Sequence, residues 1–183
     1  MALAALACGP LALALRSSDR FTLRDLESVQ RLTPGDFADL FEYFKFVYSP
    51  RVQTAEVFLG GQAGDCDDYA ILADHVLRQK GYTTRLVQVR MVGMTYDHAV
   101  CYVDESGAYL DYNLRQYTFN LKRSKPHLRD IAGKVANSLG HNWTVAFEFT
   151  YSYLEGRKKT RYVVVKTEDP SRDPDRQLRS QSP

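Results

Sequence analysis

Three short segments of the chain carry residue types that are suited to nucleophilic acyl chemistry. Cys66 lies in the segment Asp-Cys-Asp-Asp-Tyr-Ala at 65–70, His98 begins the segment His-Ala-Val, and Asp111 ends the segment Tyr-Leu-Asp. A thiol can attack a carbonyl carbon, an imidazole can move the proton, and a carboxylate can orient the imidazole and stabilise its charged form. Cys66, His98 and Asp111 are therefore the candidate catalytic residues.

The elements around Cys66 predict how the thiol is presented. A helix is expected from Asp65 to about Lys80, ended by Gly81, and its buried stripe contains Tyr69, Ala70, Ala73, Val76 and Leu77. Cys66 lies one turn before Tyr69, on the inward side, where the free N–H groups and the helix dipole stabilise a thiolate and a developing oxyanion. His75 falls on the opposite side of this helix, so it is not the base for this thiol.

The imidazole and the carboxylate are expected on two adjacent strands. The apolar pattern predicts strands over 84–92, 98–103 and 108–112, with a turn at 104–107. An even-length turn would pair Val100 with Asp111 and His98 with Asn113, so that these side chains share one face of the sheet.

Two residues could then orient His98. Asn113 could fix only the ring tautomer, whereas Asp111 could also stabilise the imidazolium, and we favour Asp111 for that reason. Cys101 lies on the other face of its strand and is expected to be a small core residue.

The remaining pattern supplies helices before the site and a hairpin after it. A short amphipathic helix is expected over 22–32 and a second one over 34–48, followed by a flexible glycine-rich turn at 60–64. A long hairpin is expected over 145–166. The segment 167–183 lacks apolar periodicity and is expected to be a disordered tail.

Length and composition are typical of one domain, which we assign to residues 21–166. The 183-residue chain is 44% hydrophobic and 12% aromatic, enough for a single core. With 24 basic and 22 acidic residues, its net charge of +2 does not favour a nucleic acid or an anionic membrane as partner. The three cysteines have neither zinc-site spacing nor the number of a disulfide framework, so at least one free thiol is expected.

The N-terminal segment 1–20 is apolar and rich in Ala and Leu up to Arg16. It is too short to span a bilayer as a helix, and it lacks the positively charged start of a secretory signal. Two interpretations remain open. A signal remnant would favour an exported protein, whereas a short apolar segment packed on the domain would suit a cytoplasmic one.

The three motifs resemble those of the transglutaminase-like superfamily, in particular the bacterial transglutaminase-like cysteine proteinases. In that family a Gly-x-Cys-Asp/Glu-Asp-Tyr/Phe-Ala segment opens the nucleophile helix, and His and Asp follow on adjacent strands. The segment 64–70 matches closely, and the segments at 98–100 and 110–114 match more loosely. The resemblance implies a papain-like α+β fold, with the nucleophile helix packed on an antiparallel β-sheet.

The resemblance also implies an activity and further site residues. Cys66 would be the nucleophile, His98 the base and Asp111 the orienting acid of a hydrolase that cleaves peptide or related amide bonds in a protein or peptide substrate. We expect the Cys66 N–H, with Gln62, to hold the oxyanion. No cofactor is required, but some members of the family bind calcium through the acids at the positions of Asp65 and Asp67, whose hard oxygens suit that ion.

Two other functions remain open from the sequence. The chain could transfer the acyl group to an amine, although Asp65 stands where transglutaminases proper have glutamine, which favours hydrolysis. It could also be a non-catalytic binding module that keeps the fold, although no triad residue is missing. The acids at 65–68 could equally serve only to cap the helix.

Overall fold

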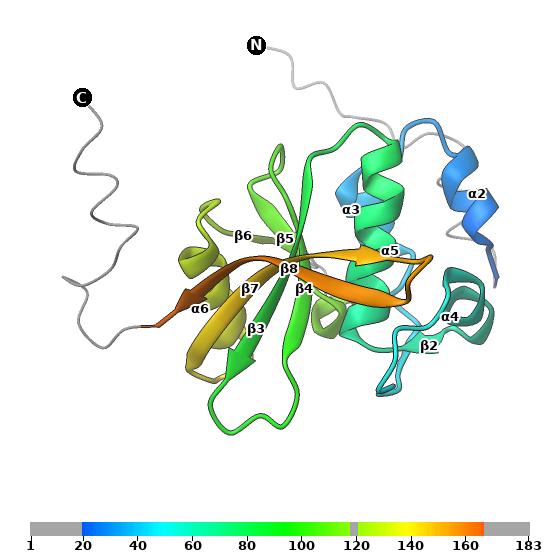
Figure 1. Cartoon of the computed structure of the whole chain (residues 1–183). Coiled ribbons are helices and arrows are strands. Elements are labelled where there is room, and N and C mark those ends of the chain that lie inside the picture. Colours follow the sequence, from blue (N-terminus) through cyan, green and yellow to red (C-terminus); the bar gives the residue numbers. More distant parts are fainter. Residues whose placement is uncertain (1–19, 118–120, 167–183) are drawn as a thin grey trace, which may run out of the picture.

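A six-stranded antiparallel sheet is the centre of the computed structural model, which describes residues 20–117 and 121–166 (Figure 1). The strand order is β6-β5-β4-β3-β7-β8, and each neighbouring pair is antiparallel. The strands are β3 (Thr84–Met91), β4 (His98–Val103), β5 (Ala108–Leu110), β6 (Leu121–Arg123), β7 (Trp143–Ser152) and β8 (Arg157–Val165). The α+β fold with an antiparallel sheet that the sequence predicts is confirmed.

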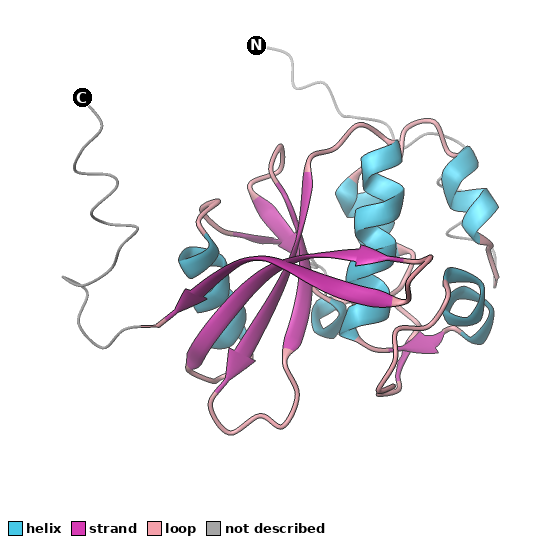
Figure 2. Ribbon diagram, viewed as in Figure 1, coloured by secondary structure: helices cyan, strands magenta, loops and turns pink. Residues whose placement is uncertain are grey.

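Two helices, α5 (Cys66–Gln79) and α6 (Leu128–Ser138), cover opposite faces of this sheet (Figure 2). The side chains of β4 alternate between the two cores, as the two-residue period of a strand requires. Ala99, Cys101 and Val103 pack in the core with α5, whereas Val100 and Tyr102 pack in the core with α6. The sheet therefore has no broad solvent-exposed face at β4.

Helix α5 follows from its sequence signals, and its expected bounds are confirmed. Asp65 is the N-cap, and its side chain forms a capping box with Asp68. Gly81 follows the C-terminal end with a φ of 87°, a conformation that glycine adopts without steric cost. The expected buried stripe is present, and the helix packs its whole inward side against the sheet.

The N-terminal third is less regular than the sequence pattern predicts. Helices α2 (Leu23–Ser28) and α3 (Pro34–Asp39) are each capped by a threonine, but both end before the expected residue. After α3 the chain forms tight turns and then β1 (Lys45–Phe46), which pairs in parallel with β2 (Ala63–Gly64). The prediction of a helix up to residue 48 is wrong, because Phe41 and Phe44 reach the core through these turns and Val47 remains exposed.

Three other local predictions need correction. The glycine-rich segment is not a free turn, because α4 (Ala55–Gly61) includes its first two glycines and only Gln62 is left-handed, with a φ of 48°. The strand that begins at Ala108 ends at Leu110, and the 3-10 helix η1 (Tyr112–Leu114) follows. Helix α6 was not predicted, although its buried residues recur at helical spacing: Leu128, Ile131, Ala132, Val135 and Ala136.

The C-terminal hairpin is confirmed as β7 and β8, with the turn between Ser152 and Arg157. The predicted apolar segment and the predicted tail lie outside the described residues, except for Arg20. Within 20–117 and 121–166, no helix has the length and apolar character needed to cross a bilayer.

Candidate active site

Cys66 is the first residue of α5, and its approach is shaped by the glycine two residues before it. A Cβ atom at Gly64 would lie 2.5 Å from Asp68 Oδ2 and 2.6 Å from the ring of Phe58. Any larger residue there would push the start of α5 away from α4. The Cys66 side chain is partly buried and forms no disulfide. A thiol at this end of the helix faces the positive end of the helix dipole.

His98 and Asp111 form a buried pair beside this thiol. His98 Nε2 lies 2.8 Å from Asp111 Oδ1, and the carboxylate is fully buried. The Cys66 side chain hydrogen-bonds to the same imidazole, which leaves Nδ1 as the ring atom for the thiol because Nε2 faces the carboxylate. The structure thus brings together the thiol, the imidazole and the carboxylate that the sequence nominates.

The surroundings of His98 favour its charged form. Burial lowers the pKa of the imidazole, but the negative charge of Asp111, its hydrogen bond and the hydrogen bond with Cys66 together raise it well above the ordinary value. The imidazole is thus held between the Asp111 carboxylate and the Cys66 thiol.

Asp111 and Asn113, the two candidates for orienting His98, occupy different positions relative to its ring. The β4–β5 ladder has the predicted register from Val103 opposite Ala108 to Cys101 opposite Leu110. Beyond that pair the chain turns into η1, so His98 does not face Asn113 across the sheet as the extended register implied. Asp111 is instead the N-cap of η1, and the backbone N–H of Asn113 donates to its Oδ1 at 2.9 Å. Asn113 thus contacts the carboxylate through its backbone.

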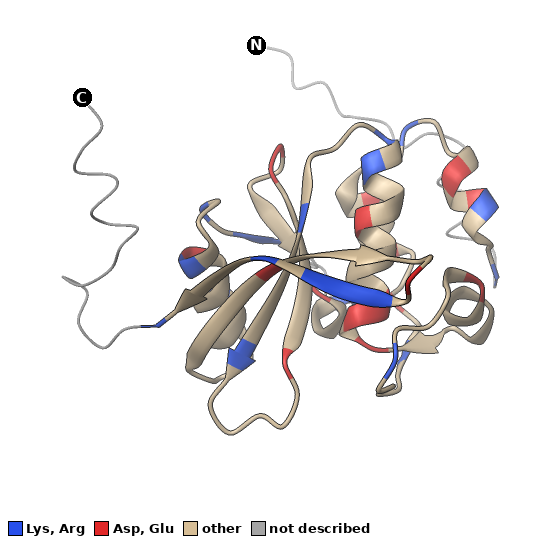
Figure 3. Ribbon diagram, in the orientation of Figure 1, with Lys and Arg blue, Asp and Glu red and all other residues tan. Residues whose placement is uncertain are grey.

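Acidic residues are concentrated at the start of α5 (Figure 3), and those around Cys66 are engaged with the protein itself. Asp65 is buried, and its two oxygens accept backbone N–H groups of Ser49, Asp67 and Asp68. Burial raises the pKa values of Asp65 and Asp68, although the hydrogen bonds that each carboxylate accepts oppose the rise. The capping role considered from the sequence is therefore present at Asp65.

A calcium ion prefers six to eight oxygen ligands. Asp65 has its oxygens turned to backbone donors, and Asp67 Oδ1 lies 2.6 Å from Lys158 Nζ. The described part of the chain contains no cluster of three or more histidine, cysteine or acidic side chains arranged for a metal. With Lys158 on Asp67 and backbone donors on Asp65, these two acids do not offer a calcium ion the ligands it needs.

Two glutamines lie near the start of α5, and the sequence nominates only one of them. Gln62 ends α4, and its carbonyl accepts the N–H of Lys45. Gln53, which was missed, donates through its backbone and its side chain to the two oxygens of Asp68, at 2.7 and 2.9 Å. No local pattern marks Gln53, because its role depends on a loop folding back onto α5.

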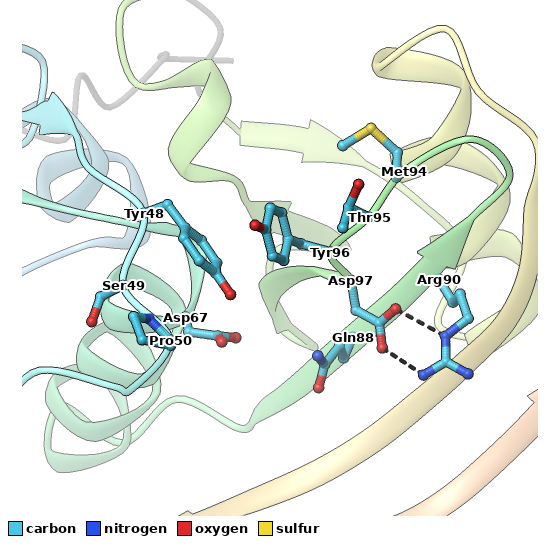
Figure 4. Close-up of a pocket in the computed structure, with 10 residues that line it drawn as sticks. All are labelled: Tyr48, Ser49, Pro50, Asp67, Gln88, Arg90, Met94, Thr95, Tyr96 and Asp97. Atoms are coloured by element: carbon cyan, nitrogen blue, oxygen red, sulfur yellow. Dashed lines mark hydrogen bonds and ion pairs between the residues drawn. The ribbon is translucent and has the colours of Figure 1, made fainter.

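A pocket of about 400 Å³ lies between the segment that carries Tyr48 and the segment that carries Tyr96 (Figure 4). Its walls include Asp67 and Asp97, the neighbours of Cys66 and His98 in the sequence. The rings of Tyr48 and Tyr96 meet there with centroids 4.0 Å apart, and Arg90 binds Asp97 through two nitrogens. The complete lining is Tyr48, Ser49, Pro50, Asp67, Gln88, Arg90, Met94, Thr95, Tyr96 and Asp97.

The other cysteine and histidine near the site have structural surroundings. Cys101 is fully buried in the core with α5, as predicted, and burial raises the pKa of its thiol well above the ordinary value. His75 lies on the outer side of α5, where its ring contacts Glu27 at 3.1 Å. Neither residue competes with Cys66 or His98 for a catalytic role.

Comparison with known proteins identifies the class to which this arrangement belongs. A family model described as a transglutaminase-like domain matches residues 28–123, which include Cys66, His98 and Asp111. Because this match covers more than half of the chain, the protein belongs to the transglutaminase-like domain family.

Among solved structures, the chain is similar to calcium-bound LapG of Legionella pneumophila. The identity is 15% and the TM-score 0.44, over 75% of this chain and 81% of that one. No curated protein sequence gives a significant match.

Proposed function

We propose that this protein is a thiol-dependent hydrolase that cleaves peptide or related amide bonds through an acyl-enzyme. The observation that carries the proposal is the continuous contact from Asp111 through His98 to Cys66 at the N-terminus of α5. Because the imidazole is in contact with both groups, it is suited to move the proton in each half of the reaction.

In the first half of the reaction, the Cys66 thiolate attacks the carbonyl carbon of the scissile bond. The N–H group of Cys66 receives the negative charge that develops on the carbonyl oxygen, and we assign a supporting role there to Gln62. The His98 imidazolium gives its proton to the amide nitrogen, the C–N bond breaks, and the amine leaves. Cys66 then carries the acyl group as a thioester.

In the second half, neutral His98 takes a proton from water, whose oxygen attacks the thioester carbonyl. The C–S bond breaks, the carboxylic acid leaves, and the thiolate–imidazolium pair forms again. Asp111 keeps its charge throughout and stabilises the imidazolium. No step requires a cofactor. We assign this activity to a domain of residues 21–166, and the expected substrate is a protein or peptide.

A burst experiment tests the covalent step without knowledge of the natural substrate. With p-nitrophenyl acetate, the wild type should release about one equivalent of p-nitrophenol per protein before the steady state, and peptide mapping should find the acetyl group on Cys66. Cys66→Ala should abolish the burst, whereas Cys101→Ala should retain it. A burst that survives Cys66→Ala, or no acyl group on Cys66 in the wild type, would contradict the proposal.

Hydrolysis of amide bonds needs a second measurement. Incubation with a degenerate peptide mixture should yield new termini that mass spectrometry detects in the wild type and not in His98→Ala. If an amine such as glycine methyl ester is added, products should still be predominantly free acids. Predominant amine adducts would identify the protein as an acyl transferase instead.

A further inference from the structure

The C-terminal hairpin reaches the first turn of the nucleophile helix through one side chain. Lys158, near the start of β8, places its Nζ 2.6 Å from Oδ1 of Asp67, the residue that follows Cys66. The two residues lie far apart in the sequence, and Lys158 is outside the segment that the family model matches. The contact therefore joins a part of the chain that carries no family motif to the candidate site.

The position of the Lys158 ammonium group is fixed from several sides. The β7–β8 ladder sets Lys158 opposite Tyr151. Its Nζ lies 5.1 Å from the ring centroid of Phe149 and 3.4 Å from Gln88 Oε1, in addition to the Asp67 contact. Lys158 and Asp67 each keep only about a quarter of their side-chain surface exposed, at 26% and 25%. A carboxylate, an amide oxygen and an aromatic face together form a specific environment for a cation.

The neighbouring lysine provides a contrast. Lys159 is next in β8 and lies on the exposed side of the strand, opposite Thr150. The alternation of side chains along a strand turns Lys158 toward α5 and Lys159 away from it. The two residues have the same chemistry and almost the same place in the chain, and differ in whether they reach Asp67.

A cation next to Asp67 would offset the effect of its negative charge on the thiol. Its negative charge lies one residue from the thiol, where it would oppose formation of the Cys66 thiolate. Asp65, on the other side of the thiol, already has backbone N–H donors on both oxygens. Asp67 is thus the acid beside the nucleophile that depends on a partner from outside its own helix.

We propose that Lys158 is a positioning residue of the Cys66 site, which neutralises Asp67 and holds the first turn of α5 against the hairpin in place of a divalent cation. The part that concerns Cys66 reactivity rests on the proposed function, whereas the part that concerns stability and cation binding does not. The chain itself supplies the positive charge, so calcium should have no effect on the wild type.

Thermal unfolding with and without 5 mM calcium tests the structural part, with Lys158→Met and the matched control Lys159→Met. Lys158→Met should lower Tm by about 2–4 °C, the size expected from losing one partly buried ion pair in a protein of this length. Calcium should then raise the Tm of Lys158→Met by mass action, because the Asp67 carboxylate is open. It should leave the wild type and Lys159→Met unchanged.

A second set of variants shows whether Lys158 acts through Asp67. In Asp67→Asn the carboxylate is absent, so adding Lys158→Met should lower Tm by less than it does in the wild type. Calcium should not stabilise the double variant. Equal Tm values for Lys158→Met and Lys159→Met would overturn the proposal. A rise in the Tm of the wild type with calcium as large as that of Lys158→Met would also overturn it.

The rate of Cys66 alkylation by iodoacetamide at pH 7 provides a readout that a purely structural role would not change. Lys158→Met should slow alkylation about threefold, and Lys158→Arg or the double variant with Asp67→Asn should restore most of the rate. An unchanged rate in Lys158→Met would refute the electrostatic role. If Cys66 were no nucleophile at all, the burst test would fail while the Tm and calcium results could still hold, so the two failures are distinguishable.

Discussion

At the scale of single residues, the contact between His98 and Asp111 decides the charge state of the site. The imidazole is buried, and a buried imidazole alone would prefer to be neutral. A carboxylate at 2.8 Å and the hydrogen bond with Cys66 reverse that preference and raise the pKa of His98 well above the ordinary value. These interactions together therefore outweigh the cost of burying the imidazolium.

Replacing the Asp111 carboxylate by an amide should lower the pKa of His98. In Asp111→Asn the burial of His98 remains but the negative charge of Asp111 is gone, so the pKa of His98 should fall. NMR titration of the His98 ring protons measures both values. Similar pKa values in the wild type and Asp111→Asn would show that Asp111 does not set the charge of the imidazole.

The same shift predicts a pH dependence of stability. Folding raises the pKa of His98, so the stabilisation is fully present below the pKa of the unfolded chain and is lost as the pH rises through the higher folded value. Urea unfolding at a series of pH values should show the wild type losing stability on the alkaline side of the ordinary histidine pKa. Asp111→Asn should not show that loss.

At the scale of elements, the start of α5 depends on close contact with α4. Gly64 has no room for a Cβ atom, because Asp68 and Phe58 lie within 2.6 Å of where it would be. Gly64→Ala should therefore destabilise the protein by about 1–3 kcal/mol, as overpacking does in other cores. Gly60→Ala is the control, since a Cβ atom there meets nothing within 4 Å and alanine favours the helix.

Urea unfolding of the two glycine variants measures this difference. Gly60→Ala should match the wild type or be more stable by up to about 1 kcal/mol. Equal stability of Gly64→Ala and Gly60→Ala would show that α4 and α5 do not need this close approach.

The elements also show what the sequence can and cannot predict. Helix α5 and strands β3 to β5 have long apolar patterns and clear turn or cap residues, so their bounds could be read closely. Strands β1 and β2 have two residues each and are defined by pairing between distant segments, for which no local pattern exists. Helix α6 carries no catalytic motif, but its regular apolar stripe is a sufficient signal for a helix.

Some residues of the candidate site can be predicted from the sequence and others cannot. Cys66, His98 and Asp111 could be selected because each lies in a short motif on a predicted element. The partners that surround them could not be selected, since Gln53 and Lys158 reach α5 only through the tertiary fold. The paired rings of Tyr48 and Tyr96 come from two loops, whose conformations are not determined by apolar periodicity.

At the scale of the whole molecule, the elements after Arg123 complete the sheet and one of its two cores. Strand β3 pairs with β7, and α6 covers Val87, Val89, Val100 and Tyr102. A chain that ends at Lys125 would leave this apolar face open to water, so it should not unfold cooperatively. A chain that ends at Lys166 retains all the described elements and is the matched control.

Circular dichroism during heating compares the two shortened chains. The chain that ends at Lys166 should show one cooperative transition near that of the wild type, and the chain that ends at Lys125 should show none. A cooperative transition at an unchanged Tm in the shorter chain would mean that residues 28–123, the part matched by the family model, form an independent unit.

The measurement that tests the central claim most directly is the site and rate of brief iodoacetamide alkylation at neutral pH, in a Cys8→Ser background. Cys66 should be modified first, because it lies at a helix N-terminus beside the His98 imidazolium, whereas Cys101 is buried in the core and should react only on unfolding. His98→Ala should slow the modification of Cys66 by at least about tenfold, as expected from loss of its charged partner. Preferential modification of Cys101, or a Cys66 rate that His98→Ala leaves unchanged, would contradict the assignment of Cys66 as an activated nucleophile.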